Sequence, residues 1–253
     1  MLYQSHVVAD MADVRHFTHE LIQLASGLKL EASLSVPPER LASSTEKKLA
    51  VCLHPWSWLG GRMDDPVLQG VKKPLLERGY YVLRYNSRGV GKSSGWPSLT
   101  GTTEAQDLLE LLRWAVDTIQ GVKQVVIFGY SHGSLIASLF PLLPDPIQVS
   151  HVLLSYPLGP RSWLTAFRGK HYTNTLNTLL RDPKSKVLVV YGDLDEFTGV
   201  ESYDAWADGL EEEAQGDGKG ELTVERVHGA THFWTDQNDA RGRMLQVLTD
   251  WLP

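Results

Sequence analysis

Apolar and polar residues alternate near the start of the chain. Every second position from Leu28 to Val36 is apolar, and a similar segment at 17–24 precedes the turn-forming pair Ser26-Gly27. This pattern predicts a half-buried β-hairpin, which ends at Pro37 because proline cannot extend the ladder.

Farther along the chain the alternation stops, and apolar residues form short, nearly unbroken runs. These runs lie at 49–53, 80–85, 125–128, 152–154 and 187–191, and a last strand is expected at 222–227. A strand without a polar face must be covered on both sides, so the runs predict a parallel sheet between two helix layers.

Helical periodicity separates the runs. The predicted helices lie at 66–78, 103–119, 134–140, 202–210 and 240–251, and the acidic, glycine-rich segment 211–220 is expected to be a loop. Strand–helix alternation after a hairpin predicts an α/β fold with a mostly parallel, doubly wound sheet. No segment resembles an interdomain linker, so we expect one domain over residues 1–253.

Composition narrows the functional class. Cys52 is the one cysteine in 253 residues, which excludes an internal disulfide and a multi-cysteine zinc module. The 24 Lys and Arg against 30 Asp and Glu give a net charge of −6 without a basic run, so no nucleic-acid partner is expected. No apolar window reaches about 18 residues and the first residues lack a signal-peptide pattern, so we expect a cytoplasmic protein without a membrane partner.

Two segments match the pattern Gly-x-Ser-x-Gly, around Ser131 and around Ser93. A nucleophilic serine with this pattern sits on a sharp turn between a strand and a helix. Ser131 directly follows the run 125–128 and precedes an apolar helix, whereas Ser93 follows a polar loop and runs into Gly95-Trp96-Pro97. Ser131 is therefore the candidate nucleophile. The P-loop-like ending at Ser93 lacks its first glycine, because position 86 is Asn86, so no nucleotide site is expected there.

A serine nucleophile needs a histidine base and an acid that orients the imidazole. The acid is expected after the run 187–191, where Asp195 is preferred over Asp193 and Glu196 because it lies beyond the strand end. The base is expected after the last strand, where His232 is preferred over His228. These two histidines are four residues apart, but Gly229 disfavours a helix and no HExxH glutamate is present, so no metal is expected.

Acyl transfer also needs two N–H donors for the developing oxyanion. One is expected from the backbone of His132, which follows the nucleophile. The second is expected from the loop after strand 49–53, where Pro55 has no N–H and Trp56 is the preferred donor, with Leu53 and Ser57 as alternatives. Three further tryptophans in loops at this sheet edge, Trp58, Trp96 and Trp234, predict a partly aromatic substrate pocket.

With these motifs in order, the chain resembles the α/β-hydrolase fold superfamily, in particular its small serine hydrolases with little or no lid. The resemblance is carried by His54-Pro55 with Gly60-Gly61, by 86–93, by 129–133, by 192–196 and by 229–233. It implies a catalytic triad of Ser131, Asp195 and His232. Many members of this superfamily carry a multi-helix lid between the strands that correspond to 152–154 and 187–191. Here only about 30 residues separate these strands, so we expect a short lid-like insertion near 157–184 and not a large cap.

The sequence thus predicts a serine hydrolase that cleaves an ester or thioester of a small or medium acyl substrate. Neither a cofactor nor a metal is expected, and nothing indicates the oligomeric state. Two alternatives stay open at this point. The triad could serve a lyase, cyclase or acyltransferase, because one fold supports many reactions, or the chain could be a non-catalytic scaffold with a vestigial triad.

Overall fold

A single sheet of eight strands organises the computed structural model, which describes residues 14–235 and 239–253. The strand order is β1-β2-β4-β3-β5-β6-β7-β8. The strands are β1 Phe17–Gln23, β2 Lys29–Ser35, β3 Lys47–Leu53, β4 Tyr80–Tyr85, β5 Val122–Tyr130, β6 Gln148–Leu154, β7 Lys186–Gly192 and β8 Glu221–Val227. The predicted hairpin is confirmed as antiparallel β1 and β2, and β2 also pairs antiparallel with β4, while all later neighbours are parallel.

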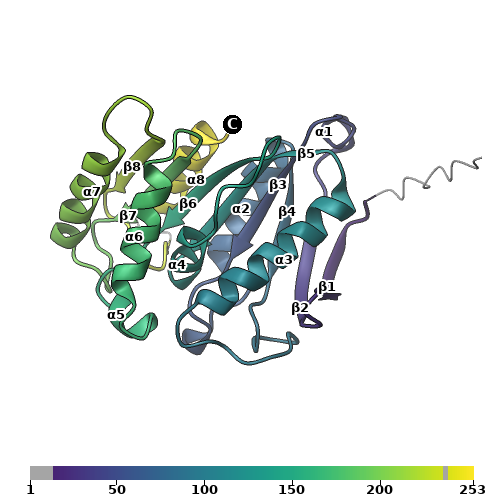
Figure 1. Cartoon of the computed structure of the whole chain (residues 1–253), viewed down its shortest axis with the longest axis horizontal. Coiled ribbons are helices and arrows are strands. Elements are labelled where there is room, and N and C mark those ends of the chain that lie inside the picture. The colour runs from purple at the N-terminus through teal and green to yellow at the C-terminus, as the bar shows by residue number, and fades with distance from the viewer. Residues whose placement is uncertain (1–13, 236–238) are drawn as a thin grey trace, which may run out of the picture.

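Helices cover both faces of the sheet (Figure 1). Helices α3 Thr102–Ile119, α4 His132–Ser138, α6 Gly169–Leu180 and α7 Val200–Ala214 share one apolar core with the sheet, and α2 Pro66–Glu77 and α8 Ala240–Trp251 share the other. Short helices α1 Glu39–Ala42, α5 Arg161–Leu164 and the 3₁₀ turn η1 Ser57–Leu59 lie in connections. The predicted doubly wound α/β architecture is confirmed.

The central strands explain the unbroken apolar runs. Along β3, Leu49 and Val51 face one core, and Ala50 and Cys52 between them face the other. Both faces of this part of the strand are shielded from water, so every position from Leu49 to Leu53 is apolar. Burial raises the pKa of the Cys52 thiol to about 12, so this side chain packs as a small apolar group.

The segment expected to act as a short lid divides into two parts. Helix α6 packs against α4 and α7, and it buries Tyr172, Leu176 and Leu180 in the core beneath the sheet. It is therefore the crossover helix between parallel strands β6 and β7, and only the part near α5 borders the pocket described below. Helix α7 continues to Ala214, so the first residues of the expected acidic loop are helical, which corrects that expectation.

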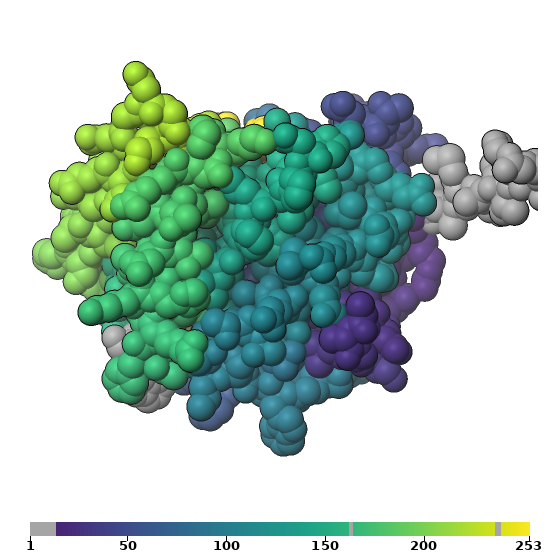
Figure 2. Space-filling view, in the orientation of Figure 1, coloured from purple at the N-terminus to yellow at the C-terminus, as the bar shows by residue number. Residues whose placement is uncertain are grey.

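The space-filling view shows the molecule from the side of α3 and α6, with the purple β1–β2 hairpin and the yellow-green α7 at opposite ends (Figure 2). Among the described residues, no helix combines the length and the apolar character that crossing a bilayer requires.

The strand order reverses direction between β3 and β5. Strand β4 lies on one side of β3, whereas β6, β7 and β8 follow β5 on the other side. The loops that leave the carboxyl ends of β3 and β5 therefore diverge to opposite sides and open a crevice, which is where open α/β sheets bind ligands.

Candidate active site

Ser131 occupies a sharp turn between β5 and α4. Its φ of 53° and ψ of −120° are unusual for a residue with a side chain, and the conformation costs about 1–3 kcal/mol. The flanking glycines make the turn possible: a Cβ on Gly129 would lie 2.4 Å from the carbonyl oxygen of Gly133. The backbone N–H of Ser131 donates to the carbonyl of Leu154 at 2.9 Å, which ties the turn to β6.

The structure brings Ser131, His232 and Asp195 together. Nε2 of His232 lies 2.9 Å from Oγ of Ser131, and its Nδ1 lies 2.7 Å from Oδ2 of Asp195. All three residues are buried, with exposed fractions between 4% and 9%. The acid is held in place by the N–H groups of Phe197 and Thr198, which donate to Oδ1 at 2.9 and 3.0 Å.

The alternative residues have different partners. Asp193 lies 2.6 Å from Nδ1 of His228, and its other oxygen accepts from the N–H of Gly229 at 2.7 Å. The His228 side chain is 94% exposed and that of Asp193 only 7%, so in this second pair the histidine faces solvent and the aspartate is buried. The pair binds the end of β7 to the end of β8 and does not contact Ser131.

Glu196, the third candidate for the acid, holds the main chain of the histidine. Its carboxylate accepts from the N–H of His232 at 2.7 Å. On the other side, the hydroxyl of Tyr130 donates to the carbonyl of His232 at 2.8 Å. The sequence alone did not indicate these two contacts, although Glu196 and Tyr130 are direct neighbours of Asp195 and Ser131 along the chain.

The second Gly-x-Ser-x-Gly segment has a structural role. Oγ of Ser93 donates to the carbonyl of Asn86 at 2.7 Å and accepts from the N–H of Glu31 at 2.9 Å. Ser93 therefore joins the β4 loop to β2. Gly91 in this loop has a φ of 60°, and a Cβ there would lie 2.4 Å from the Glu31 carboxylate.

The two expected oxyanion donors lie on a helix start and a loop that are in contact. His132 is the first residue of α4, so its N–H belongs to the helix N-terminus. Trp56 follows Pro55 in the loop after β3 and immediately precedes η1. A Cβ on Gly133 would lie 2.5 Å from the carbonyl of Leu53 and 2.8 Å from that of His54, so the β3 loop rests directly against the start of α4.

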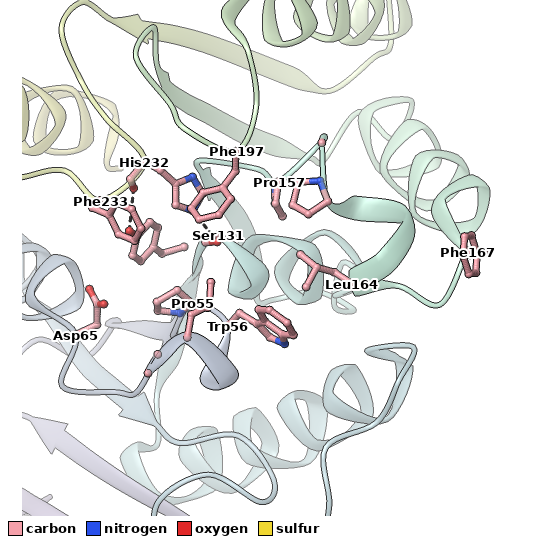
Figure 3. A pocket seen from close by; sticks show the side chains of 16 residues that line it. Pro55, Trp56, Asp65, Ser131, Pro157, Leu164, Phe167, Phe197, His232 and Phe233 are labelled. Atoms are coloured by element: carbon pink, nitrogen blue, oxygen red, sulfur yellow. Dashed lines mark hydrogen bonds between the residues drawn. The ribbon is translucent and has the colours of Figure 1, made fainter.

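Ser131 opens into a pocket of about 690 Å³ (Figure 3). The lining is mostly apolar and comes from the β3 loop, from the segment between β6 and α6, and from the loops after β7 and β8. The sixteen lining residues are Pro55, Trp56, Leu59, Gly60, Gly61, Asp65, Tyr130, Ser131, Pro157, Gly159, Pro160, Leu164, Phe167, Phe197, His232 and Phe233.

The expected tryptophan lining needs correction. Trp58 stacks on Trp56 with ring centroids 5.7 Å apart and borders a smaller neighbouring cavity of about 190 Å³. Trp96 is 86% exposed and lines neither cavity, and Trp234 is buried, with its indole N–H donating to Ser155 at 3.0 Å. A loop position at the sheet edge does not determine on which side of the backbone a side chain lies.

Phenylalanines supply most of the aromatic lining. Phe233 follows the candidate base directly, and Phe197 lies two residues after the candidate acid, with its ring 4.6 Å from the His232 ring. Both residues lie in loops after predicted strands, so their positions in the sequence make them candidates for the lining without showing that their side chains face the pocket. For Leu164 and Phe167, which also line the pocket, no sequence pattern indicated this position.

Two histidines beside the site are kept neutral. Burial lowers the pKa of His54 and of His132 to about 4 in each case. Across the described part of the chain, no three His, Cys, Asp or Glu side chains converge as they would around a metal ion.

Comparison with known proteins identifies the fold. Residues 67–168 match the family described as the α/β-hydrolase fold. An uncharacterised protein of Rickettsia prowazekii is 33% identical over 116 residues, which are 46% of this chain and 48% of that protein, so the match spans about half of the relative's length.

Solved structures match over nearly the whole chain. An α/β serine hydrolase homologue from Coxiella burnetii has a TM-score of 0.67 and 25% identity, covering 94% of this chain and 99% of that one. An α/β serine hydrolase without a lid, from Xanthomonas campestris, has a TM-score of 0.67 and 22% identity over 96% of both chains. Sequence and structure together show that this chain has the α/β-hydrolase fold.

Proposed function

We propose that the protein is a serine hydrolase that cleaves carboxylic esters or thioesters of small or medium acyl groups through an acyl-enzyme. The observation that carries the proposal is the unbroken hydrogen-bonded chain from Ser131 through His232 to the buried Asp195. The strained turn at Ser131 supports it, because such a turn presents a nucleophile at the mouth of a pocket. Its similarity to serine hydrolases agrees with this chemistry.

In the first half-reaction Oγ of Ser131 attacks the substrate carbonyl carbon. Nε2 of His232 takes the hydroxyl proton, while the Nδ1–H donates to Asp195, which fixes the tautomer and stabilises the imidazolium. The carbonyl oxygen becomes an oxyanion, for which we assign the N–H groups of His132 and Trp56 as donors.

Collapse of the tetrahedral intermediate breaks the bond to the leaving alcohol or thiol. His232 returns its proton to that leaving group, which departs and leaves an ester on Ser131. In the second half-reaction His232 deprotonates a water molecule, which attacks the acyl-enzyme. The products are the free carboxylic acid and the regenerated serine.

The pocket suggests how the substrate lies. The leaving atom must receive its proton from His232, so the leaving group belongs beside Tyr130 and Phe233. Figure 3 shows Leu164 and Trp56 on the other side of Ser131 from Phe233, where the acyl group would then extend. The apolar lining on this side favours an apolar acyl group.

Labelling with a fluorophosphonate probe tests the proposal without knowledge of the substrate. We expect the wild-type protein to be labelled at Ser131, and Ser131→Ala to abolish labelling. Ser93→Ala is the matched control, because it removes the serine of the second Gly-x-Ser-x-Gly segment and should leave labelling intact. Labelling that survives in Ser131→Ala would contradict the assignment of the nucleophile.

A panel of p-nitrophenyl esters from acetate to decanoate then tests turnover. We expect hydrolysis that Ser131→Ala lowers by up to about 10⁶-fold in kcat, as for other serine triads. A protein that is labelled at Ser131 but turns over no ester or thioester would instead favour a reaction in which water is not the acyl acceptor.

A further inference from the structure

His54 joins two loops beside the candidate oxyanion site. It is the first residue after β3 and is 4% exposed. Its Nδ1 lies 2.6 Å from the carbonyl oxygen of Pro55, the next residue in the chain, and its Nε2 lies 3.0 Å from the backbone nitrogen of Ser87 in the loop after β4.

These two contacts determine where the imidazole carries its proton. The Ser87 nitrogen is a backbone N–H, which can only donate, so Nε2 of His54 must be the acceptor. In a neutral imidazole the proton then sits on Nδ1, which donates to Pro55. Burial lowers the pKa of His54 to about 4, so the ring is neutral at physiological pH, in agreement with this tautomer.

The hydrogen bond to Pro55 orients the peptide group that contains the Trp56 N–H. The Pro55–Trp56 bond is trans, so its C=O and N–H point in opposite directions. Because His54 holds the Pro55 carbonyl on its own side, the Trp56 N–H points away from His54, in the opposite direction within the peptide plane. Pro55 and Trp56 both line the pocket that contains Ser131.

The next peptide group is held as well. The carbonyl of Trp56 accepts from the N–H groups of Leu59 and Gly61, both at 3.1 Å. Gly61 also lies against Pro55, so close that a Cβ on Gly61 would be 2.2 Å from the Pro55 carbonyl oxygen. Main-chain hydrogen bonds therefore hold the peptide group that follows Trp56, and the His54 side chain holds the peptide group that precedes it.

We propose that His54 is a positioning residue that holds the Trp56 N–H in place as an oxyanion donor. The inference rests on the proposed function and adds to it a role for the His54-Pro55 pair, which the triad leaves unused. Preorganised donors lower the barrier because they need no reorganisation when the negative charge develops. Without the hydrogen bond from His54, the Pro55–Trp56 peptide group would have to be reoriented in each turnover.

Three variants separate the two hydrogen bonds of His54. His54→Leu removes both. In His54→Asn the amide nitrogen lies as many bonds from the backbone as Nδ1 does, so it can still donate to Pro55. In His54→Gln the amide oxygen can reach the Ser87 N–H as Nε2 does, but the donor to Pro55 is lost. His151 provides a matched control, since it is fully buried and one ring nitrogen lies 3.0 Å from the carbonyl of Phe140, away from the pocket.

The readouts are kcat and KM for a p-nitrophenyl ester, the rate of fluorophosphonate labelling, the affinity for phenylboronic acid, and the Tm. Phenylboronic acid forms a tetrahedral adduct with serine, so its affinity reports on the oxyanion donors. We expect His54→Leu and His54→Gln to lower kcat and boronate affinity together by about 10–100-fold with KM nearly unchanged. His54→Asn should recover most of this loss, and His151→Leu should lower the Tm without changing kcat.

A folded His54→Leu variant with wild-type kcat and boronate affinity would overturn the inference, as would a loss confined to KM or equal effects for Asn and Leu. If the wild-type protein itself is neither labelled nor binds the boronate, the proposed function fails and this role falls with it. If the wild type is labelled and His54→Leu is labelled equally fast, the positioning role alone fails.

Discussion

The hydroxyl of Tyr203 donates a hydrogen bond of 3.1 Å to Oδ2 of Asp195, the oxygen that also lies 2.7 Å from Nδ1 of His232. Burial raises the pKa of Tyr203, so its hydroxyl stays protonated and remains a donor at neutral pH. Helix α7 is thus linked to the candidate triad through the Tyr203 side chain, although none of its residues lines the pocket.

Tyr203→Phe should impair both activity and stability moderately. The variant keeps the ring but deprives a buried carboxylate of one of its donors, at a cost of about 1–2 kcal/mol. Because Phe197, Thr198 and His232 still hold Asp195, we expect kcat to fall only about 3–10-fold. Steady-state kinetics and urea denaturation measure the two effects. A loss as large as that of removing Asp195 would show that the hydroxyl has a direct chemical role.

Asparagine substitutions should distinguish the two aspartate–histidine pairs. Asp195→Asn should lower kcat by about 10⁴-fold, because an amide favours the wrong imidazole tautomer for His232. Asp193→Asn changes the pair with the exposed His228 and should leave kcat within about threefold. Kinetics on one p-nitrophenyl ester suffice. Equal losses in both variants would mean that the assignment of the acid is wrong.

The physical basis of the sequence predictions explains which of them agree with the structure. The hairpin, the buried strands and the helix that ends at Trp251 follow from periodicity, which depends only on local burial. The preference for Asp195 over Asp193 rested on the position of the strand end, and Asp195 is the one that lies beside His232. The order of the motifs along the chain therefore indicated which of these side chains lie together in the fold.

Side-chain directions in loops were beyond sequence reasoning. Trp234 and Phe233 are neighbours in one loop, yet Trp234 packs in the core and Phe233 lines the pocket. Trp234 adopts a φ of 51°, which no local pattern predicts. The same limit applies to His54, whose tautomer is set by a contact with the loop after β4, 33 residues away.

Stability should depend on pH through three histidines, His54, His132 and His151. Burial lowers the pKa of each from 6.5 to about 4 in the folded protein. Between these pH values the unfolded chain binds more protons than the folded one, so the free energy of unfolding must fall as the pH falls from about 6.5 to about 4. Each such histidine contributes a slope of up to about 1.4 kcal/mol per pH unit.

His151→Leu tests this linkage. The variant should lower the slope of the free energy of unfolding against pH by the contribution of one histidine, whatever its effect on stability at pH 7. Urea denaturation at several pH values between 4 and 7 gives the slope, and His228→Leu serves as a control because that side chain is exposed. An unchanged slope in His151→Leu would mean that His151 is not the buried neutral group described above.

Chain-length preference should respond to Leu164, which lies where the pocket meets the smaller cavity and borders both. Leu164→Trp adds bulk on the expected acyl side. It should lower kcat/KM for p-nitrophenyl decanoate at least tenfold more than for the acetate, because a short acyl group does not reach the added ring. A uniform loss across the ester series would argue that the acyl group extends in the other direction, toward Phe233.

Gly133 should tolerate no side chain, although it lies inside a helix where alanine is ordinarily better by about 1 kcal/mol. A Cβ there would lie 2.5 Å from the Leu53 carbonyl and 2.8 Å from that of His54, and both are main-chain atoms that cannot rotate away. Gly133→Ala must therefore push α4 and the β3 loop apart, which separates the assigned oxyanion donors on His132 and Trp56.

We expect Gly133→Ala to lower the Tm and to reduce kcat by more than tenfold, because the two donors no longer converge on one oxygen. Gly209→Ala in α7 is the matched control, since a Cβ there meets nothing within 4 Å. It should raise the Tm slightly through helix propensity and leave kcat unchanged. Wild-type kcat in Gly133→Ala would mean that the contact between the β3 loop and α4 does not set the geometry of the oxyanion site.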